Sequence, residues 1–321
     1  MVVCFNKEMR KLLIILCLGI CFVSCSKAQN GKESTMKEYQ AKDITKLINK
    51  GKAVLFVNAI IKGDLDFSDI DDREMTAPNS FVAHVPSTIY FQSCVFLGDV
   101  KGNGYKEING KKIPVKVRFT RDVQFMDCDF RKNVDFNDAE FQASANFSKS
   151  AFRGETQFNN ILCMGHKNQW WELEADSTFM MCGSTFRGDL NLMDVQFKQD
   201  ASLQGINVNN LQISNLKADG RLDLSNANIN GFLLFNYGNC GDDVQLSFGK
   251  FDGRTDIIGT TFNGRCEMER SLFYGVVKLD RTAFKGGLNT EEAHFILTPN
   301  TEETSFANDS IPSFMGFKMN Q

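Results

Sequence analysis

Phenylalanine recurs along this chain with a spacing that restricts the fold more than any other feature. Consecutive phenylalanines in one stretch are separated by 5, 6, 5, 6, 5 and 6 residues, namely Phe125, Phe130, Phe136, Phe141, Phe147, Phe152 and Phe158. The chain divides into units of eleven, such as VQFMDCDFRKN and VDFNDAEFQAS. Positions 1, 3, 6 and 8 of each unit are apolar or small, and positions 9 to 11 are polar or glycine.

This periodicity predicts short strands joined by corners. An α-helix would not keep positions 1, 3, 6 and 8 on one face. Two inward residues separated by one outward residue are typical of a strand, and the gap before the next pair indicates a corner. One unit cannot bury its apolar side alone, so the units must stack as a parallel β-solenoid. A triangular helix of hexapeptides would need a uniform spacing of six, which the alternating fives exclude.

The repeats resemble the pentapeptide-repeat family. Its A-x-F-x-x pattern is written here as Ala139-Glu-Phe141, Ser150-Ala-Phe152 and Thr282-Ala-Phe284. The resemblance covers about residues 54–300 and implies an all-β fold, a right-handed quadrilateral parallel β-helix. The extra residue in every second repeat gives coils of about 22 residues rather than about 20.

Both ends of the repeat region, residues 54–298, need caps because open coils expose unpaired strand edges. Residues 41–53 are expected to form a short capping helix, with Asp43 as the candidate N-cap and Gly51 at its end. Residues 299–321 lose the register but keep three phenylalanines, so we expect a C-terminal cap there.

Three insertions interrupt the repeats, at residues 71–88, 101–116 and 164–178. The second resembles a β-hairpin with an Asn109-Gly110 turn. The third contains His166 and both tryptophans of the chain, Trp170 and Trp171. Adjacent tryptophans in a polar insertion form a candidate binding loop for a sugar ring or a protein. The alternative is a local plug over the flank of the solenoid.

The N-terminus has the features of a bacterial lipoprotein signal. Three basic residues precede an apolar run from Leu12 to Val23, which is too short to span a bilayer and is typical of a secretory signal. Phe22-Val23-Ser24-Cys25 resembles a lipobox, with Phe22 where leucine is usual. The resemblance implies that residues 1–24 are removed by cleavage after Ser24 and that Cys25 is acylated. An ordinary signal cleaved nearby and an uncleaved anchor remain alternatives, and Met9 is a second possible start.

Residues 25–40 are expected to be a flexible tether between an acylated Cys25 and the capping helix. The lipid bilayer is then a partner, since buried acyl methylenes hold a protein on a membrane. Ser26 stands where an inner-membrane retention signal has aspartate, which favours the outer membrane of the cell envelope, facing the periplasm. The choice of membrane and face stays open, as does the oligomeric state.

Charge and motif content argue against several kinds of function. The net charge of −3 becomes −5 once residues 1–24, with three basic and one acidic side chain, are removed. This is too near neutral for a nucleic-acid surface. The six remaining cysteines form no Cys-x-x-Cys pair and have no histidine at zinc-ligand spacing, so we expect no metal site and no cofactor. No nucleophile motif or phosphate loop is present, so no enzyme is expected.

Cys94 and Cys128 both hold position 6 of their units, one full coil apart if Val117 resumes the register after the second insertion. We therefore expect the two thiols to contact each other in one interior column and to stay unbonded.

These observations predict a structural or interaction scaffold for an envelope protein or a glycan. The alternatives are a carbohydrate-binding or carbohydrate-active β-helix and a DNA mimic that protects topoisomerases. The family resemblance implies the mimic, but the lipobox and the small charge argue against it.

Overall fold

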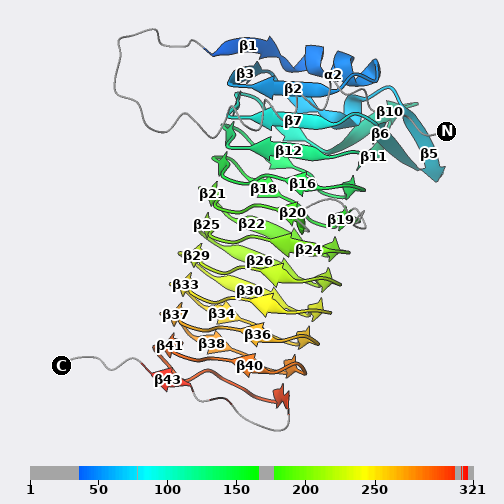
Figure 1. The fold of residues 1–321 in the computed structure, drawn as a ribbon. Coiled ribbons are helices and arrows are strands. Elements are labelled where there is room, and N and C mark those ends of the chain that lie inside the picture. The colour runs from blue at the N-terminus through cyan, green and yellow to red at the C-terminus, as the bar shows by residue number, and fades with distance from the viewer. Residues whose placement is uncertain (1–35, 78, 166–176, 308–311, 313, 317–321) are drawn as a thin grey trace, which may run out of the picture. The chain divides into compact units, whose positions relative to one another are not determined.

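The computed structural model describes residues 36–77, 79–165, 177–307, 312 and 314–316, and all structural statements below concern these residues. The described residues build a parallel β-solenoid whose coils each contribute short strands to four walls (Figure 1). Within a coil the chain visits the walls in a fixed order, which we number 1 to 4. This is the four-sided, all-β parallel helix predicted from the sequence.

Four sheets form the walls, and neighbouring strands in each come from consecutive coils, except for the antiparallel pairs β5–β6 and β10–β11 in wall 4. Wall 1 contains β2 (Val54–Val57), β7 (Ile89–Gln92), β12 (Val123–Met126), β16 (Ala145–Asn146), β20 (Ser177–Met180), β24 (Asp200–Ser202), β28 (Leu222–Asp223), β32 (Val244–Gln245), β36 (Cys266–Glu267) and β40 (Leu288–Asn289). Wall 2 contains β1 (Lys37–Gln40), β3 (Ala59–Lys62), β8 (Val95–Phe96), β13 (Asp129–Phe130), β17 (Ala151–Phe152), β21 (Thr185–Phe186), β25 (Asn207–Val208), β29 (Asn228–Ile229), β33 (Lys250–Phe251), β37 (Leu272–Phe273), β41 (His294–Phe295) and β43 (Met315–Gly316).

The other two walls complete each coil. Wall 3 contains β4 (Leu65–Asp66), β9 (Val100–Lys101), β14 (Val134–Asp135), β18 (Thr156–Gln157), β22 (Leu190–Met193), β26 (Leu211–Ser214), β30 (Leu233–Asn236), β34 (Thr255–Asp256) and β38 (Val277–Lys278). Wall 4 contains β5 (Arg73–Ala77), β6 (Ser80–Val85), β10 (Asn103–Ile108), β11 (Lys111–Phe119), β15 (Glu140–Phe141), β19 (Leu162–Cys163), β23 (Gln196–Phe197), β27 (Lys217–Ala218), β31 (Asn239–Cys240), β35 (Thr261–Phe262), β39 (Ala283–Phe284) and β42 (Ser305–Phe306). A 3-10 turn, η1 (Phe67–Asp69), follows β4.

The strand register confirms the repeat length. Val123 pairs with Ala145, the residue 22 positions further on, in the next coil. Ala201 pairs with Leu222 because one unit in that coil has ten residues instead of eleven. The inward positions form continuous apolar columns, in which runs of stacked rings alternate with aliphatic residues such as Val208 and Ile229. In wall 2 the ring centroids of Phe130 and Phe152 lie 4.8 Å apart. This repeated ring contact explains why the fold requires so many phenylalanines.

Two corner positions have their own backbone requirements. Position 5 of most units has a positive φ, for example 54° at Asp127, where glycine, asparagine and aspartate are the residues that fit most easily. At position 10 adjacent corners come very close. A Cβ on Gly253 would lie 2.1 Å from the carbonyl oxygen of Gly231 in the preceding coil, so only glycine fits.

The N-terminal cap is larger than the sequence indicated. Helix α2 runs from Ala41 to Asn49, so it begins before Asp43, which lies in its first turn and pairs with Lys46 instead of capping the helix. Residues 37–40, expected to be tether, form β1 and pair with β3 at the edge of wall 2. β1 therefore covers a strand edge that the helix alone would leave open.

The C-terminal end keeps the register further than expected. Ser305 and Phe306 pair with Ala283 and Phe284 in wall 4. The Phe306 ring stacks on Phe284 with centroids 5.6 Å apart, and Phe314 meets Phe295 edge-on. Residues 305 and 306 therefore belong to the repeat region and not to a separate cap. No helix among the described residues is long and apolar enough to cross a membrane.

Candidate interaction surfaces

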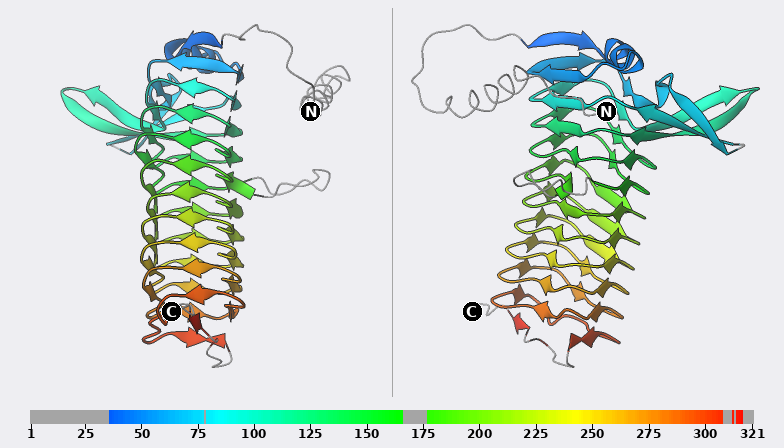
Figure 2. Two further views of the ribbon diagram at one scale, coloured as in Figure 1. Left: turned by 90° about the vertical axis from the view of Figure 1, so that its left-hand side faces the viewer. Right: turned by 45° about the vertical axis from the view of Figure 1, so that its right-hand side comes forward.

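The first two insertions both leave the solenoid at the corner between walls 3 and 4, on consecutive coils. They combine into one four-stranded sheet, in the order β5, β6, β11 and β10, which extends wall 4 away from the coils (Figure 2). We call this sheet the wing. The sequence predicts two separate insertions, because nothing in either segment indicates that β6 pairs with β11.

The wing confirms one expectation and corrects another. β10 and β11 form the predicted hairpin, and Asn109 and Gly110 have φ values of 50° and 71° at its turn. Residues 71–88 are not all insertion, because Ala83 and Val85 are buried and pair with Val117 and Phe119 as ordinary wall residues. The short apolar run before Pro86 was therefore a wall strand.

The surface of the wing is polar and charged. Tyr105 is 71% exposed on β10, and Lys106 lies over the ring of Phe81. Along the outer side of wall 4, Arg118 Nε donates to Glu140 at 2.6 Å and Glu74 lies between Arg118 and His84. Glu140 raises the pKa of Arg118 by hydrogen bonding. The wing thus presents an open strand edge on β10, and a network of ion pairs crosses β5, β6, β11 and β15.

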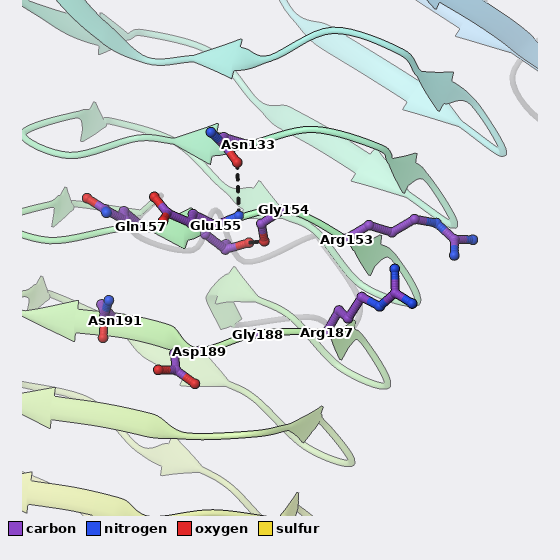
Figure 3. Close-up of a pocket in the computed structure, with 10 residues that line it drawn as sticks. Asn133, Arg153, Gly154, Glu155, Gln157, Arg187, Gly188, Asp189 and Asn191 are labelled. Carbon is purple, nitrogen blue, oxygen red and sulfur yellow. Dashed lines mark hydrogen bonds between the residues drawn. The ribbon is translucent and has the colours of Figure 1, made fainter.

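A shallow hollow of about 610 Å³ lies at the corner between walls 2 and 3 (Figure 3). Its lining is polar and comes from three successive coils, including Asn133, Arg153, Glu155, Arg187 and Asp189. Glycines at 154 and 188 occupy the corner itself. Figure 3 shows the side chains of Arg153 and Arg187 extending next to each other, with the amides and carboxylates on the other side.

Arginines form a column next to this hollow, at position 9 of three successive coils. Arg153 donates twice to Asp129, at 2.5 Å and 3.1 Å, and Arg131 contacts the same carboxylate at 2.7 Å. The hydrogen bonds to Asp129 raise the pKa of Arg153. Arg187 has no acidic partner within the described part of the chain. Sequence reasoning missed this column, although the repeated F-R pair in Phe130-Arg131, Phe152-Arg153 and Phe186-Arg187 is its signal.

The site residues chosen from the sequence lie outside the described residues. These are the lipidation candidate Cys25 and the loop residues His166, Trp170 and Trp171. The third insertion leaves wall 4 after Cys163 and the chain re-enters wall 1 at Ser177. The described residues on either side of this insertion therefore border the corner between walls 4 and 1, whereas the hollow lies between walls 2 and 3 and the wing leaves between walls 3 and 4.

The predicted contact between Cys94 and Cys128 is confirmed. Val95 pairs with Asp129, so the preceding cysteines occupy the same position in adjacent coils, and their side chains are neighbours in the interior. Both are free thiols, and burial raises the pKa of Cys128. Each sulfur also lies near a backbone carbonyl of the previous coil, that of Phe56 for Cys94 and that of Phe91 for Cys128.

No group of three or more His, Cys, Asp or Glu side chains within the described ranges is arranged to hold a metal ion. Residues 115–161 match the family model of pentapeptide repeats (9 copies). No curated protein and no solved structure matches the chain. The family match, with a register that continues through coils on both sides of it, supports a pentapeptide-repeat protein.

Proposed function

We propose that this protein is a non-catalytic interaction scaffold anchored to the bacterial cell envelope by an acylated Cys25. The observation that carries the proposal is the order of residues 7–25, basic, then apolar, then small, then cysteine, ahead of a repeat fold. Ser26 favours the outer membrane, and we propose that the protein faces the periplasm.

The scaffold role follows from how the solenoid is built. Its inward residues are buried in the apolar columns, and its corners are fixed by backbone hydrogen bonds between coils. Outward side chains contribute little to the stability of the fold, so those on the walls and the wing can bind a partner. Pentapeptide repeats are generally structural, and the family match indicates no catalytic family.

The anchor is tested by metabolic labelling with a clickable fatty acid, followed by membrane fractionation. We expect label and membrane association in the wild type and loss of label in Cys25→Ala. The matched control is Cys182→Ala, which removes a half-buried cysteine that follows the wall 1 strand β20. An unlabelled wild type, or label that survives Cys25→Ala, would contradict the proposal.

Carbohydrate binding is the second candidate, and the hollow in Figure 3 is the observation that favours it. Amide, carboxylate and guanidinium groups line a shallow open surface, and these groups hydrogen-bond to sugar hydroxyls in either direction.

A further inference from the structure

The arginines of the column share a single bonded carboxylate among the described residues. Asp129 accepts hydrogen bonds from both Arg131 and Arg153, at 2.7 Å and 2.5 Å, so one carboxylate pairs with two guanidinium groups. The third guanidinium, that of Arg187, has no carboxylate within hydrogen-bond reach among the described residues. An arginine has five N–H donors and remains charged, so Arg187 keeps its full donor capacity.

The coil geometry sets the spacing of these charges. Phe130 pairs with Phe152, and Phe152 with Phe186, so the arginines that follow them repeat once per coil. Parallel strands lie about 4.8 Å apart, so the side chains leave the backbone at about that interval along the solenoid axis. Like charges at such spacing repel each other, and an anion placed between Arg153 and Arg187 would relieve the repulsion.

The opposite side of the hollow offers groups of another kind. Asn133 uses its amide oxygen to accept from the backbone N–H of Glu155 at 3.0 Å, which leaves its amide N–H groups to donate. Gln157 accepts from Asn137 at 2.7 Å in the same way. Asp189 is held by the side chains of Asn209 and Asn210. These groups are fixed donors and acceptors of the sort that sugar hydroxyls use.

The hollow is also open where a side chain could have filled it. A Cβ on Gly188 would meet no atom within 4 Å, so packing does not require glycine there. Gly154 differs, because its Cβ would lie 2.6 Å from the backbone of Lys132. The missing side chain at 188 therefore leaves space next to Arg187.

We propose that the hollow binds an acidic sugar unit of an anionic polysaccharide that runs along the solenoid axis. The carboxylate or sulfate of the sugar pairs with Arg153 and Arg187, and its hydroxyls bond to Asn133, Gln157 and the carboxylates of Glu155 and Asp189. A polyanion without hydroxyls would face those two carboxylates with nothing to donate, so the lining favours a sugar over a phosphate chain. The inference deepens the carbohydrate-binding candidate and does not depend on acylation of Cys25.

The test is titration of the purified full-length protein with four probes of matched chain length: polygalacturonate, dextran sulfate, neutral dextran and polyphosphate. We expect saturable binding to polygalacturonate or dextran sulfate, at least 10-fold weaker in Arg187→Gln and weaker at high salt. Gly188→Leu should weaken binding by blocking the hollow without removing a charge. Arg221→Gln, an exposed arginine at another corner, is the control and should leave binding unchanged.

The two acidic glycans distinguish a carboxylate from a sulfate as the recognised group. Binding to neither of them would overturn the proposal, as would equal binding to dextran or polyphosphate, or binding that Arg187→Gln and Gly188→Leu leave unchanged. Thermal melting of each variant checks that the fold is retained. Loss of fatty-acid label with retained glycan binding would reject only the envelope anchor.

Discussion

The hydroxyl of Ser150 makes two hydrogen bonds between coils, and its two backbone partners can pair with each other when it is removed. Its hydroxyl is buried, donates to the carbonyl of Phe125 at 2.8 Å and accepts from the backbone N–H of Cys128 at 3.1 Å. Ser150→Ala removes both bonds. If both backbone groups stayed unpaired, the free energy of unfolding would fall by about 2–6 kcal/mol, at about 1–3 kcal/mol for each group.

The structure shows how the turn would respond instead. Where the next coil supplies Ala227 rather than a hydroxyl, the backbone N–H of Ile206 donates directly to the carbonyl of Leu203 at 3.3 Å. In the Ser150→Ala variant, the turn formed by residues 125–128 should close in the same way and recover one bond of the two. The net loss is then one hydrogen bond, about 1 kcal/mol.

The assay is chemical denaturation of full-length Ser150→Ala, followed by far-ultraviolet circular dichroism. Ser148→Ala, at a half-buried outward position, is the matched control and should stay within about 0.5 kcal/mol of the wild type. Ser184→Ala repeats the geometry one coil further on and should give the same result. A loss above about 3 kcal/mol, or one no larger than that of Ser148→Ala, would refute the reasoning.

Three further predictions concern the interior and the corners. Phe136→Ala should lower the free energy of unfolding by about 3–5 kcal/mol, because the ring is fully buried and stacks on Phe158. Substitution of the exposed Lys149 by alanine should change it by less than about 0.5 kcal/mol. Equal effects of the two substitutions in chemical denaturation would contradict the register. Gly253→Ala should lower the free energy of unfolding by about 1–3 kcal/mol, because the new Cβ would meet the backbone of Gly231. Gly188→Ala, where a Cβ has open space, should leave it unchanged. Equal melting temperatures of the two variants would contradict the close approach of the corners. Burial raises the pKa of Cys240 to about 12 from an ordinary 9.0, so its thiol should resist alkylation at pH 8 until the protein unfolds. The unfolded state loses this proton more readily, so the free energy of unfolding should fall as the pH rises from 9.0 toward 12. Rapid labelling of Cys240 in the folded protein, detected by mass spectrometry, would contradict its burial.

The walls were predictable from the sequence because each inward position repeats the same local requirement. A phenylalanine every five or six residues determines which side faces inward, how long a coil is and where the corners fall. The contact between Cys94 and Cys128 followed from the same count.

Other features depend on contacts between distant segments, and a repeat pattern does not encode those. The pairing of β6 with β11 that builds the wing joins two insertions, each of which reads as an independent loop. β1 was missed because residues 37–40 are polar and mostly exposed, as expected for an added edge strand. The hollow was missed because its arginines look like ordinary outward residues until the coils are stacked.

Bulky residues at position 5 adopt a backbone conformation that their residue type does not predict. Tyr237 and Phe248 have positive φ values of 58° and 59°, where the sequence pattern elsewhere favours asparagine, aspartate or glycine. Backbone pairing on both sides holds these corners in place, so the solenoid overrides the local preference of the residue.

Lipid anchoring is tested most directly by the mass of the N-terminal peptide of the mature protein, extracted from its native envelope. We expect an N-terminal peptide that begins at Cys25 and carries a diacylglycerol group, with residues 1–24 absent. An unmodified Cys25, or a mature chain that begins at another residue, would contradict a lipid-anchored scaffold.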